Sequence, residues 1–275
     1  MKIQHRVSFN TKSDLAKDLK AMGLTFKEGP IISTLEIDES DRQWPQIESL
    51  VEMYEAVDLA DTKFTKKELD SAGWLRMGAS WHHGYPMPDD DFGYLGRTYD
   101  LSCYDPKTGI GKLQKAPFQM KAEPVWKKNH LLQLNWIYDV FFVLPEVWES
   151  VFKPLGVECE PVVKYDSGEI LKTVVQLKSG GVVPSPLELT GFPKEGEKYL
   201  PINKGYFPGA STFKGWSRHY LQSQEYFGSG ASASKAIIVS AEFYSAMKDN
   251  KLKGVDFVPM RTESRHDGAY NQRNS

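Results

Sequence analysis

The sequence is poor in cysteine, in long apolar runs and in charge of one sign, and each shortage excludes a class of protein. Two cysteines in 275 residues, Cys103 and Cys159, do not make the disulfide framework of a small secreted domain. A formal charge of −2 gives no whole-molecule field that would attract nucleic acid or an anionic membrane. No segment approaches the roughly 18 apolar residues of a membrane span, and the first six residues lack the apolar stretch of an export signal. We therefore expect a cytoplasmic protein with no membrane partner and no general nucleic-acid binding.

Motifs that mark catalytic sites are also lacking. There is no Gly-x-Ser-x-Gly elbow, no His-Glu-x-x-His helix and no kinase set, and neither cysteine stands in a nucleophile signature. The glycine-rich turn that begins at Gly228 precedes a strand, which is the wrong order for a P-loop or a dinucleotide fold. We expect no cofactor. A site assembled from distant segments would be invisible in one sequence, so enzymatic activity stays open, although the missing motifs favour a non-catalytic protein.

The pattern of apolar residues predicts an α+β fold. Hydrophobic residues make up 40% of the chain, which is enough to form a full core. Strands are predicted at residues 6–9, 31–37 and 170–177, and helices at residues 13–23 and 44–57. A helix that starts near residue 65 should carry Leu69 and Trp74 on one side. The dense apolar run 131–143 suits a buried strand or strand pair.

An internal repeat is the clearest signal of organisation. Residues 141–161 and 237–259 both read as strand, helix, glycine and strand, with Gly156-Val157 matching Gly254-Val255. Each glycine suits the left-handed position at the end of a helix. We therefore predict equivalent strand–helix–strand units, with Val143 and Val239 buried at matching positions.

Loop-rich β inserts rich in Gly, Pro and aromatic residues separate the helical elements. This organisation predicts an N-terminal α+β region at residues 1–130, which holds an aromatic and acidic loop. A C-terminal α+β region at residues 131–261 would hold the two strand–helix–strand units. The polar residues 262–275 are predicted to be a mobile tail.

The loop at residues 74–104 carries aromatic side chains beside an acidic triplet, Asp89, Asp90 and Asp91. Long loops of this kind either pack on themselves or serve a function, and exposed aromatic anchors beside negative charge suit a basic protein partner. Trp81 and Tyr85 are therefore predicted contacts, together with the triplet. His82 and His83 are also possible metal ligands, but adjacent residues of a strand point to opposite faces, so we expect no metal here.

Two short segments share the frame x-Pro-Lys-x-Gly, at residues 105–109 and 192–196. This is the shape of a zinc knuckle, in which Pro and Gly form the tight turn between two ligands. Ordinary Pro-Lys turns are the other interpretation. In either case we expect no metal, because none of the four ligand positions is a cysteine. The positions are Asp105, Thr108, Phe192 and Glu195.

With these frames the chain resembles an uncharacterised bacterial family named for a double Cys-x-x-Cys-Gly motif. The likeness rests on the two frames, on the sequence Gly-Ile-Gly-Lys-Leu-Gln at residues 109–114, and on the strand–helix–Gly-Val unit at residues 237–259. The resemblance implies degenerate zinc knuckles. Similar endings recur in proteins that resemble toxin-neutralising partners, so it also implies an immunity-type protein that binds a basic, toxin-like protein.

A different class of function is the alternative hypothesis. An enzyme or a nucleotide-binding protein could assemble a site from His82, His83, the acidic triplet and the Gly228 loop. A deep pocket lined by these residues would favour this alternative. A convex acidic and aromatic surface would favour a protein partner.

Overall fold

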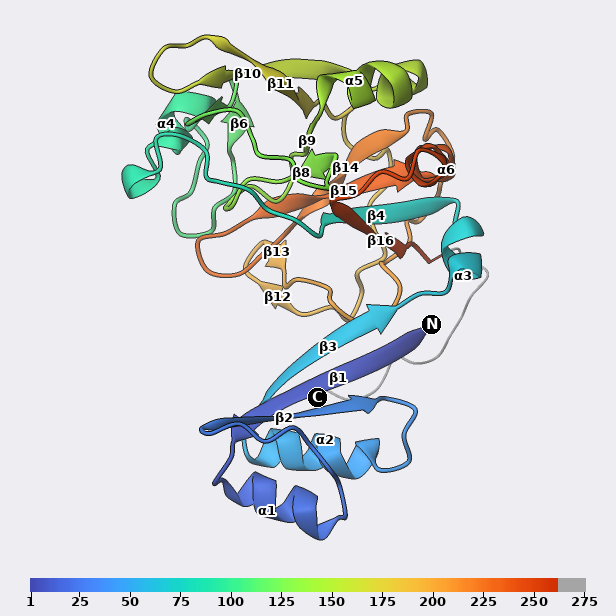
Figure 1. The fold of residues 1–275 in the computed structure, drawn as a ribbon. Coiled ribbons are helices and arrows are strands. Elements are labelled where there is room, and N and C mark those ends of the chain that lie inside the picture. Colours follow the sequence, from blue (N-terminus) through green and yellow to red (C-terminus); the bar gives the residue numbers. More distant parts are fainter. Residues whose placement is uncertain (262–275) are drawn as a thin grey trace. The chain divides into compact units, whose positions relative to one another are not determined.

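A computed structural model describes residues 1–261, and it divides the chain into two compact units (Figure 1). The first unit comprises residues 1–68 and 202–205, and the second begins at Leu69 and contains the other described residues. The sequence pattern places a boundary at residue 130, whereas residues 69–130 belong with the second unit. The reason is that strand β4 (Trp74–Ala79) pairs with strands from the C-terminal part of the chain. The predicted tail at 262–275 lies outside the described residues.

The first unit is a three-stranded antiparallel sheet with two helices on one face (Figure 1). Buried and exposed residues alternate along the strands. Ser13 caps α1 by accepting a hydrogen bond from the Ala16 N–H, and Pro45 stands in the first turn of α2. The sheet order is β2-β1-β3. Its elements are β1 (Lys2–Asn10), α1 (Asp14–Ala21), β2 (Ile32–Asp38), α2 (Trp44–Met53) and β3 (Val57–Lys63). The expected strands and helices of this region are thus present.

A buried histidine, His5, lies in the core of the first unit. The His5 ring stacks on Trp44 with centroids 3.6 Å apart. Its Nδ1 lies 2.7 Å from a carboxylate oxygen of Asp58, and its Nε2 lies 3.3 Å from one of Glu39. Glu39 also pairs with Lys204 at 2.9 Å, which ties residues 202–205 to this unit. These contacts satisfy the polar atoms of a side chain that the sheet buries.

The second unit contains a five-stranded sheet of order β7-β10-β11-β9-β8, a six-stranded sheet of order β12-β13-β14-β15-β4-β16, and the pair β5-β6. Helix α3 (Lys66–Asp70) spans the boundary between the units. The remaining elements are a 3₁₀ turn (Asp90–Phe92), α4 (Tyr94–Thr98), β5 (Tyr99–Asp100), β6 (Leu113–Gln114), β7 (Gln119–Met120), β8 (Leu131–Leu132), β9 (Phe142–Val143), α5 (Pro145–Val147), a π-helical turn (Trp148–Phe152), a 3₁₀ turn (Lys153–Leu155), β10 (Cys159–Lys164), β11 (Ile170–Leu177), β12 (Lys194–Glu195), β13 (Lys198–Tyr199), β14 (Tyr220–Phe227), β15 (Ser234–Ser240), α6 (Ala241–Asp249) and β16 (Val255–Pro259). The α+β class is therefore confirmed.

The predicted repeat is present in this unit. In each copy a strand leads into a helix, and a second strand returns parallel to the first with one antiparallel strand between them. The first copy is β9, α5 and β10 around β11, and the second is β15, α6 and β16 around β4. The register matches as well. In the first copy the residues side by side are Leu131, Val143, Val175 and Pro161. In the second they are Tyr220, Val239, Leu75 and Pro259.

The helices of the two copies pack on each other in one shared core. Phe152 and Phe243 stack with ring centroids 4.8 Å apart and planes inclined by 14°. Val143 and Val239 are both 0% exposed, as predicted. The middle strands have different origins: β11 follows the first copy in the chain, whereas β4 precedes the second copy by most of the unit. Their shared core makes the two copies a single structural body.

Two local predictions need correction, and the strand pair predicted in the run 131–143 is present in a short form. Trp74 begins strand β4 and does not extend a helix, because its segment pairs with β15. The run 131–143 pairs only at its two ends, as β8 and β9, and the buried Leu134 and Ile137 fill the core from the loop between them. At the end of α6 the left-handed residue is Lys251, and Gly254 lies further on, directly before β16.

Among residues 1–261, no helix combines the length and the apolar character needed to cross a bilayer.

Candidate functional site

Three aromatic side chains of the second unit, Tyr85, Phe92 and Trp136, pack together, and the exposed Tyr138 follows two residues after Trp136. Tyr85, Phe92 and Tyr138 are exposed by 43%, 52% and 48%, which is unusual for rings of this size. Tyr85 and Phe92 each pack against the half-buried Trp136, with centroid distances of 4.5 and 4.6 Å. We call these four residues, Tyr85, Phe92, Trp136 and Tyr138, the aromatic surface.

The backbone at the aromatic surface adopts conformations that side chains disfavour. Asp91, Phe92 and Trp136 have φ angles of 48°, 55° and 69°. Each left-handed non-glycine residue costs about 1–2 kcal/mol, so the surrounding structure must hold them there. The π-face of Trp136 provides part of that support, because it packs against Tyr94 as well as Phe92. Backbone strain of this kind concentrates at functional surfaces.

The acidic triplet lies next to the aromatic surface. Asp89 is half-buried, whereas Asp90 and Asp91 are exposed at the 3₁₀ turn that also carries Phe92. In the part of the chain that the structure describes, none of the three carboxylates takes part in an ion pair. Their negative charge is therefore uncompensated by any neighbouring lysine or arginine of the described chain.

Trp81 and His83, also predicted for this loop, lie in different surroundings, whereas the His82 ring contacts Tyr138 edge-on with centroids 6.1 Å apart. Trp81 is half-buried and packs against a core cluster, with its ring 5.3 Å from His83 and 6.3 Å from Trp126. His83 accepts a hydrogen bond from the Val125 N–H at 3.4 Å, and His82 forms a bridge with Gln133. No group of three His, Cys, Asp or Glu side chains within residues 1–261 is placed to hold a metal ion.

The two x-Pro-Lys-x-Gly frames meet at the Gly228 loop. In the first frame Asp105 accepts hydrogen bonds from the Lys107 N–H and the Thr108 hydroxyl, and these bonds lower the pKa of its carboxyl. In the second frame the Glu195 carboxylate accepts the Gly230 N–H at 3.0 Å. Phe192, by contrast, offers no ligand atom.

A buried lysine connects the two frames. Lys198 follows the second frame and is only 1% exposed. Its ammonium donates to the carbonyl of Thr108 in the first frame at 2.9 Å, and to the carbonyls of Gly230 and Ser232. Gly109 permits this approach, because a Cβ there would lie 2.4 Å from the Ala231 oxygen. The frames are thus joined by an ammonium and backbone carbonyls.

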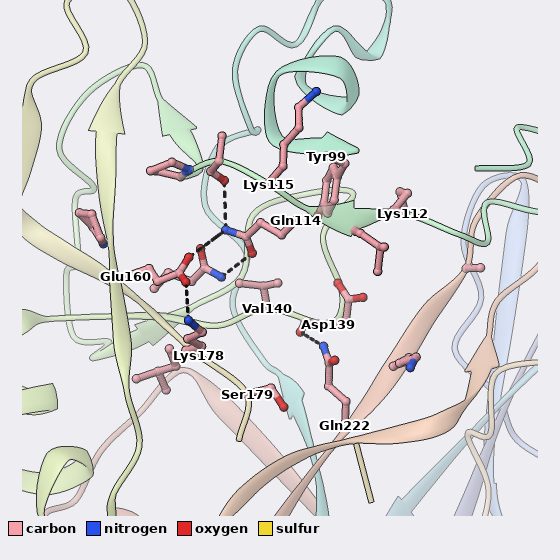
Figure 2. A pocket seen from close by; sticks show the side chains of 18 of the residues that line it. Tyr99, Lys112, Gln114, Lys115, Asp139, Val140, Glu160, Lys178, Ser179 and Gln222 are labelled. Atoms are coloured by element: carbon pink, nitrogen blue, oxygen red, sulfur yellow. Dashed lines mark hydrogen bonds and ion pairs between the residues drawn. The ribbon is translucent and has the colours of Figure 1, made fainter. Parts of the chain in front are cut away.

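A cavity of about 710 Å³ opens between the two sheets of the second unit (Figure 2). Its walls come from the β6 segment, the β10–β11 hairpin, the β14–β15 hairpin and the loop before β9. Gly111 positions the β6 segment, since a Cβ there would lie 1.9 Å from the Cys103 oxygen. Its polar lining residues are Tyr99, Lys112, Gln114, Lys115, Asp139, Glu160, Gln176, Lys178, Ser179, Gln222, Tyr226 and Lys235.

The charged groups at this cavity fall into two sets. Glu160 and Lys178 form an ion pair at 3.0 Å, so their charges compensate each other. Asp139 belongs to the other set: burial raises the pKa of its carboxyl, against the opposing effect of the Lys112 and Lys235 ammonium groups. Burial likewise lowers the pKa of Lys112. Figure 2 shows Asp139 between Lys112 and Gln222, whose amide donates to the Asp139 carbonyl at 3.2 Å.

Comparison with known proteins adds no relative: no family model, no curated protein and no solved structure matches the chain. The residues that bear on function therefore come from the geometry alone. The sequence pattern predicts Tyr85 and the acidic triplet as contacts, but it does not single out Phe92, Trp136, Tyr138 or Asp139. One signal for Asp139 is present in the sequence, because it is the only charged residue in the apolar run 131–143.

Proposed function

We propose that this chain is a non-catalytic protein that binds a basic protein partner through the aromatic surface and the acidic triplet. The observation that carries the proposal is the exposure of Tyr85, Phe92 and Tyr138 beside the unpaired Asp90 and Asp91. Aromatic side chains supply large contact areas at low entropic cost and dominate the energetics of many interfaces. Adjacent carboxylates would steer a partner of opposite charge and fix its orientation.

The support for Trp136 comes from its position under the two exposed rings. Tyr85 and Phe92 both pack against Trp136, so the three rings form one aromatic cluster that a partner side chain could contact. Phe92 and Trp136 keep left-handed φ angles in the free protein, so the packing around them already holds their rings before a partner arrives. Such preorganisation reduces the entropy lost on binding. Trp81 contributes indirectly, because it packs in the core below this loop.

The finer part of the proposal is that the partner is a toxin-like protein and that this chain is an immunity-type protein. Its support is the resemblance to the double Cys-x-x-Cys-Gly family, together with the juxtaposition of the two knuckle frames around Lys198. A packed ammonium in place of a metal is how a degenerate knuckle would keep its shape. If the partner is such a bacterial toxin, the surface of the toxin that binds this chain should be basic.

Less supports the alternative of an enzyme or nucleotide-binding protein built on His82, His83 and the Gly228 loop. None of these residues lines the cavity described above. The amide of Gly230, which an anionic phosphate would need, donates to Glu195. His83 accepts a backbone hydrogen bond at its Nε2.

The decisive experiment tests the proteins encoded on either side of this gene as partners, and the proposal expects a basic one to bind. Binding of the purified chain is measured by titration calorimetry for the wild type, Phe92→Ala and Asp90→Asn/Asp91→Asn. Because Phe92 is an exposed anchor, its removal should weaken binding by about tenfold or more, with little change in melting temperature. The double Asn variant should slow association, most strongly at low salt.

A matched control is Asp166→Asn/Glu169→Gln, which removes the same charge from an exposed turn of the same unit. It should bind as the wild type does. If Phe92→Ala and the control variant bind the partner equally well, the aromatic surface is not the contact. If no basic partner binds at all, the partner-binding function itself is refuted.

A further inference from the structure

The cavity between the two sheets has a charge arrangement that a packed core does not need. Lys112 and Lys235 both act on Asp139, yet within the described residues neither ammonium lies close enough to form an ion pair with it. Instead each ammonium lies over a tyrosine ring, Lys112 at 5.6 Å from Tyr99 and Lys235 at 5.3 Å from Tyr226. The space between the carboxylate and the two ammonium groups is therefore open.

The charge of the lining is positive once internal pairs are removed. The pair between Glu160 and Lys178 cancels, and Gln114 and Gln176 exchange hydrogen bonds at 2.7 and 2.9 Å. What remains is Asp139 with Lys112, Lys235 and the exposed Lys115. A surplus of ammonium groups in a partly desolvated concave site attracts anions more strongly than the same groups would on an open surface.

We propose that this cavity binds a small organic anion, with Lys112 and Lys235 on its anionic group and Asp139 on a hydroxyl or amino group of the same molecule. A volume of about 710 Å³ lies within the range of ligand sites and exceeds what single ions need. Lysines bind phosphate and carboxylate as point charges, and the lining contains no arginine to demand a planar partner. The carboxylate then selects for ligands that can donate a hydrogen bond.

The burial of both charge types supports this assignment. Burial raises the pKa of Asp139 and lowers the pKa of Lys112, so each group loses part of its hydration in the free protein. The Asp139 carboxylate accepts backbone hydrogen bonds, one of them from the Lys235 N–H, so a ligand donor would add to these bonds while the ligand's anionic group would give the Lys112 ammonium a partner. This site is independent of the aromatic surface, so the two proposals stand or fall separately.

Titration calorimetry of the full chain tests the proposal with glycerol 3-phosphate and glycerate, which carry hydroxyl groups beside a phosphate and a carboxylate. We expect saturable single-site binding of at least one of them, and the stronger binder identifies the anion. Absence of saturable binding of both compounds up to about 20 mM would overturn the proposal. Glycerol, which has hydroxyl groups without charge, should not bind.

Substitutions of the lining residues test which of them bind the ligand. Lys112→Gln/Lys235→Gln should weaken binding by about tenfold or more, whereas Lys164→Gln, an exposed lysine of β10, should leave it unchanged. Equal binding by both variants would refute the site. Asp139→Asn removes the negative charge and one of the two acceptor oxygens, so it should lower the affinity for glycerol 3-phosphate relative to methyl phosphate, which has no hydroxyl group. If the double lysine variant does not fold, the ratio of the affinities for glycerol 3-phosphate and methyl phosphate in Asp139→Asn tests the site instead. A ratio equal to that of the wild type contradicts the role of Asp139.

Discussion

The two strand–helix–strand copies share one register and one core, yet they differ in their helices and in what their turns touch. In the second copy α6 is regular, and Ser240 caps it by accepting the Phe243 N–H. In the first copy α5 gives way to π-helical and 3₁₀ turns, because Pro154 has no N–H to donate to the preceding turn. In these two copies the shared core positions are therefore preserved more strongly than the regular geometry of the helix.

Their glycines differ in the same way. Gly156 and Gly254 both have positive φ and precede the second strand of their copy. Nothing lies within 4 Å of a Cβ built on Gly156, whereas a Cβ on Gly254 would lie 2.0 Å from the Leu131 oxygen. The turn of the second copy therefore packs against strand β8, and the turn of the first copy does not. Equal sequence signals thus have unequal tertiary roles.

The largest effect should come from the rings that join the copies. Phe152→Ala and Phe243→Ala each remove a fully buried ring, so each should lower the free energy of unfolding by about 3–5 kcal/mol. Because the rings stack, the double variant should lose about 0.5–1.5 kcal/mol less than the sum of the single variants. Denaturant unfolding of the three variants measures this coupling, and strict additivity would show that the copies do not support each other.

The next effect distinguishes the two turns. Gly254→Ala should destabilise by about 3 kcal/mol or more, because its Cβ meets backbone that cannot move without disturbing β8. Gly156→Ala should cost only about 1 kcal/mol, which is the penalty of a left-handed alanine in open space. Thermal unfolding of both variants under one condition gives the comparison. Equal losses would mean that the close contact with Leu131 is absent in solution.

The smallest effect concerns the helix cap. Ser240→Ala removes the acceptor for the Phe243 N–H and should lower stability by about 1 kcal/mol. Ser240→Thr keeps a hydroxyl and serves as the control. At the matching position of the first copy, Leu144 makes no side-chain cap, so Leu144→Ala should report packing alone. If Ser240→Ala leaves the stability unchanged, the Ser240 cap does not contribute to the difference between the two copies.

Local patterns were sufficient to predict several elements. The strand at 170–177, the helix that begins after Ser13 and the two strand–helix–strand segments follow from apolar spacing and capping residues, which act over a few neighbouring positions. The exposure of Tyr85, Asp90 and Asp91 could also be anticipated, because glycine, proline and acids surround them, whereas Asp89 is half-buried. Trp81 lies in the same loop, but packing against the core decides its position.

Apolar spacing within each segment is enough to predict two copies of one unit and the burial of Val143 and Val239. Only the tertiary structure decided which strands lie in the middle of each copy, because β4 reaches β15 and β16 across more than half of the chain, and non-local pairing leaves no local pattern. The cavity has the same origin. Lys112, Asp139 and Lys235 are far apart in sequence, and they share one space only because the segment before β6, the loop before β9 and strand β15 come together there.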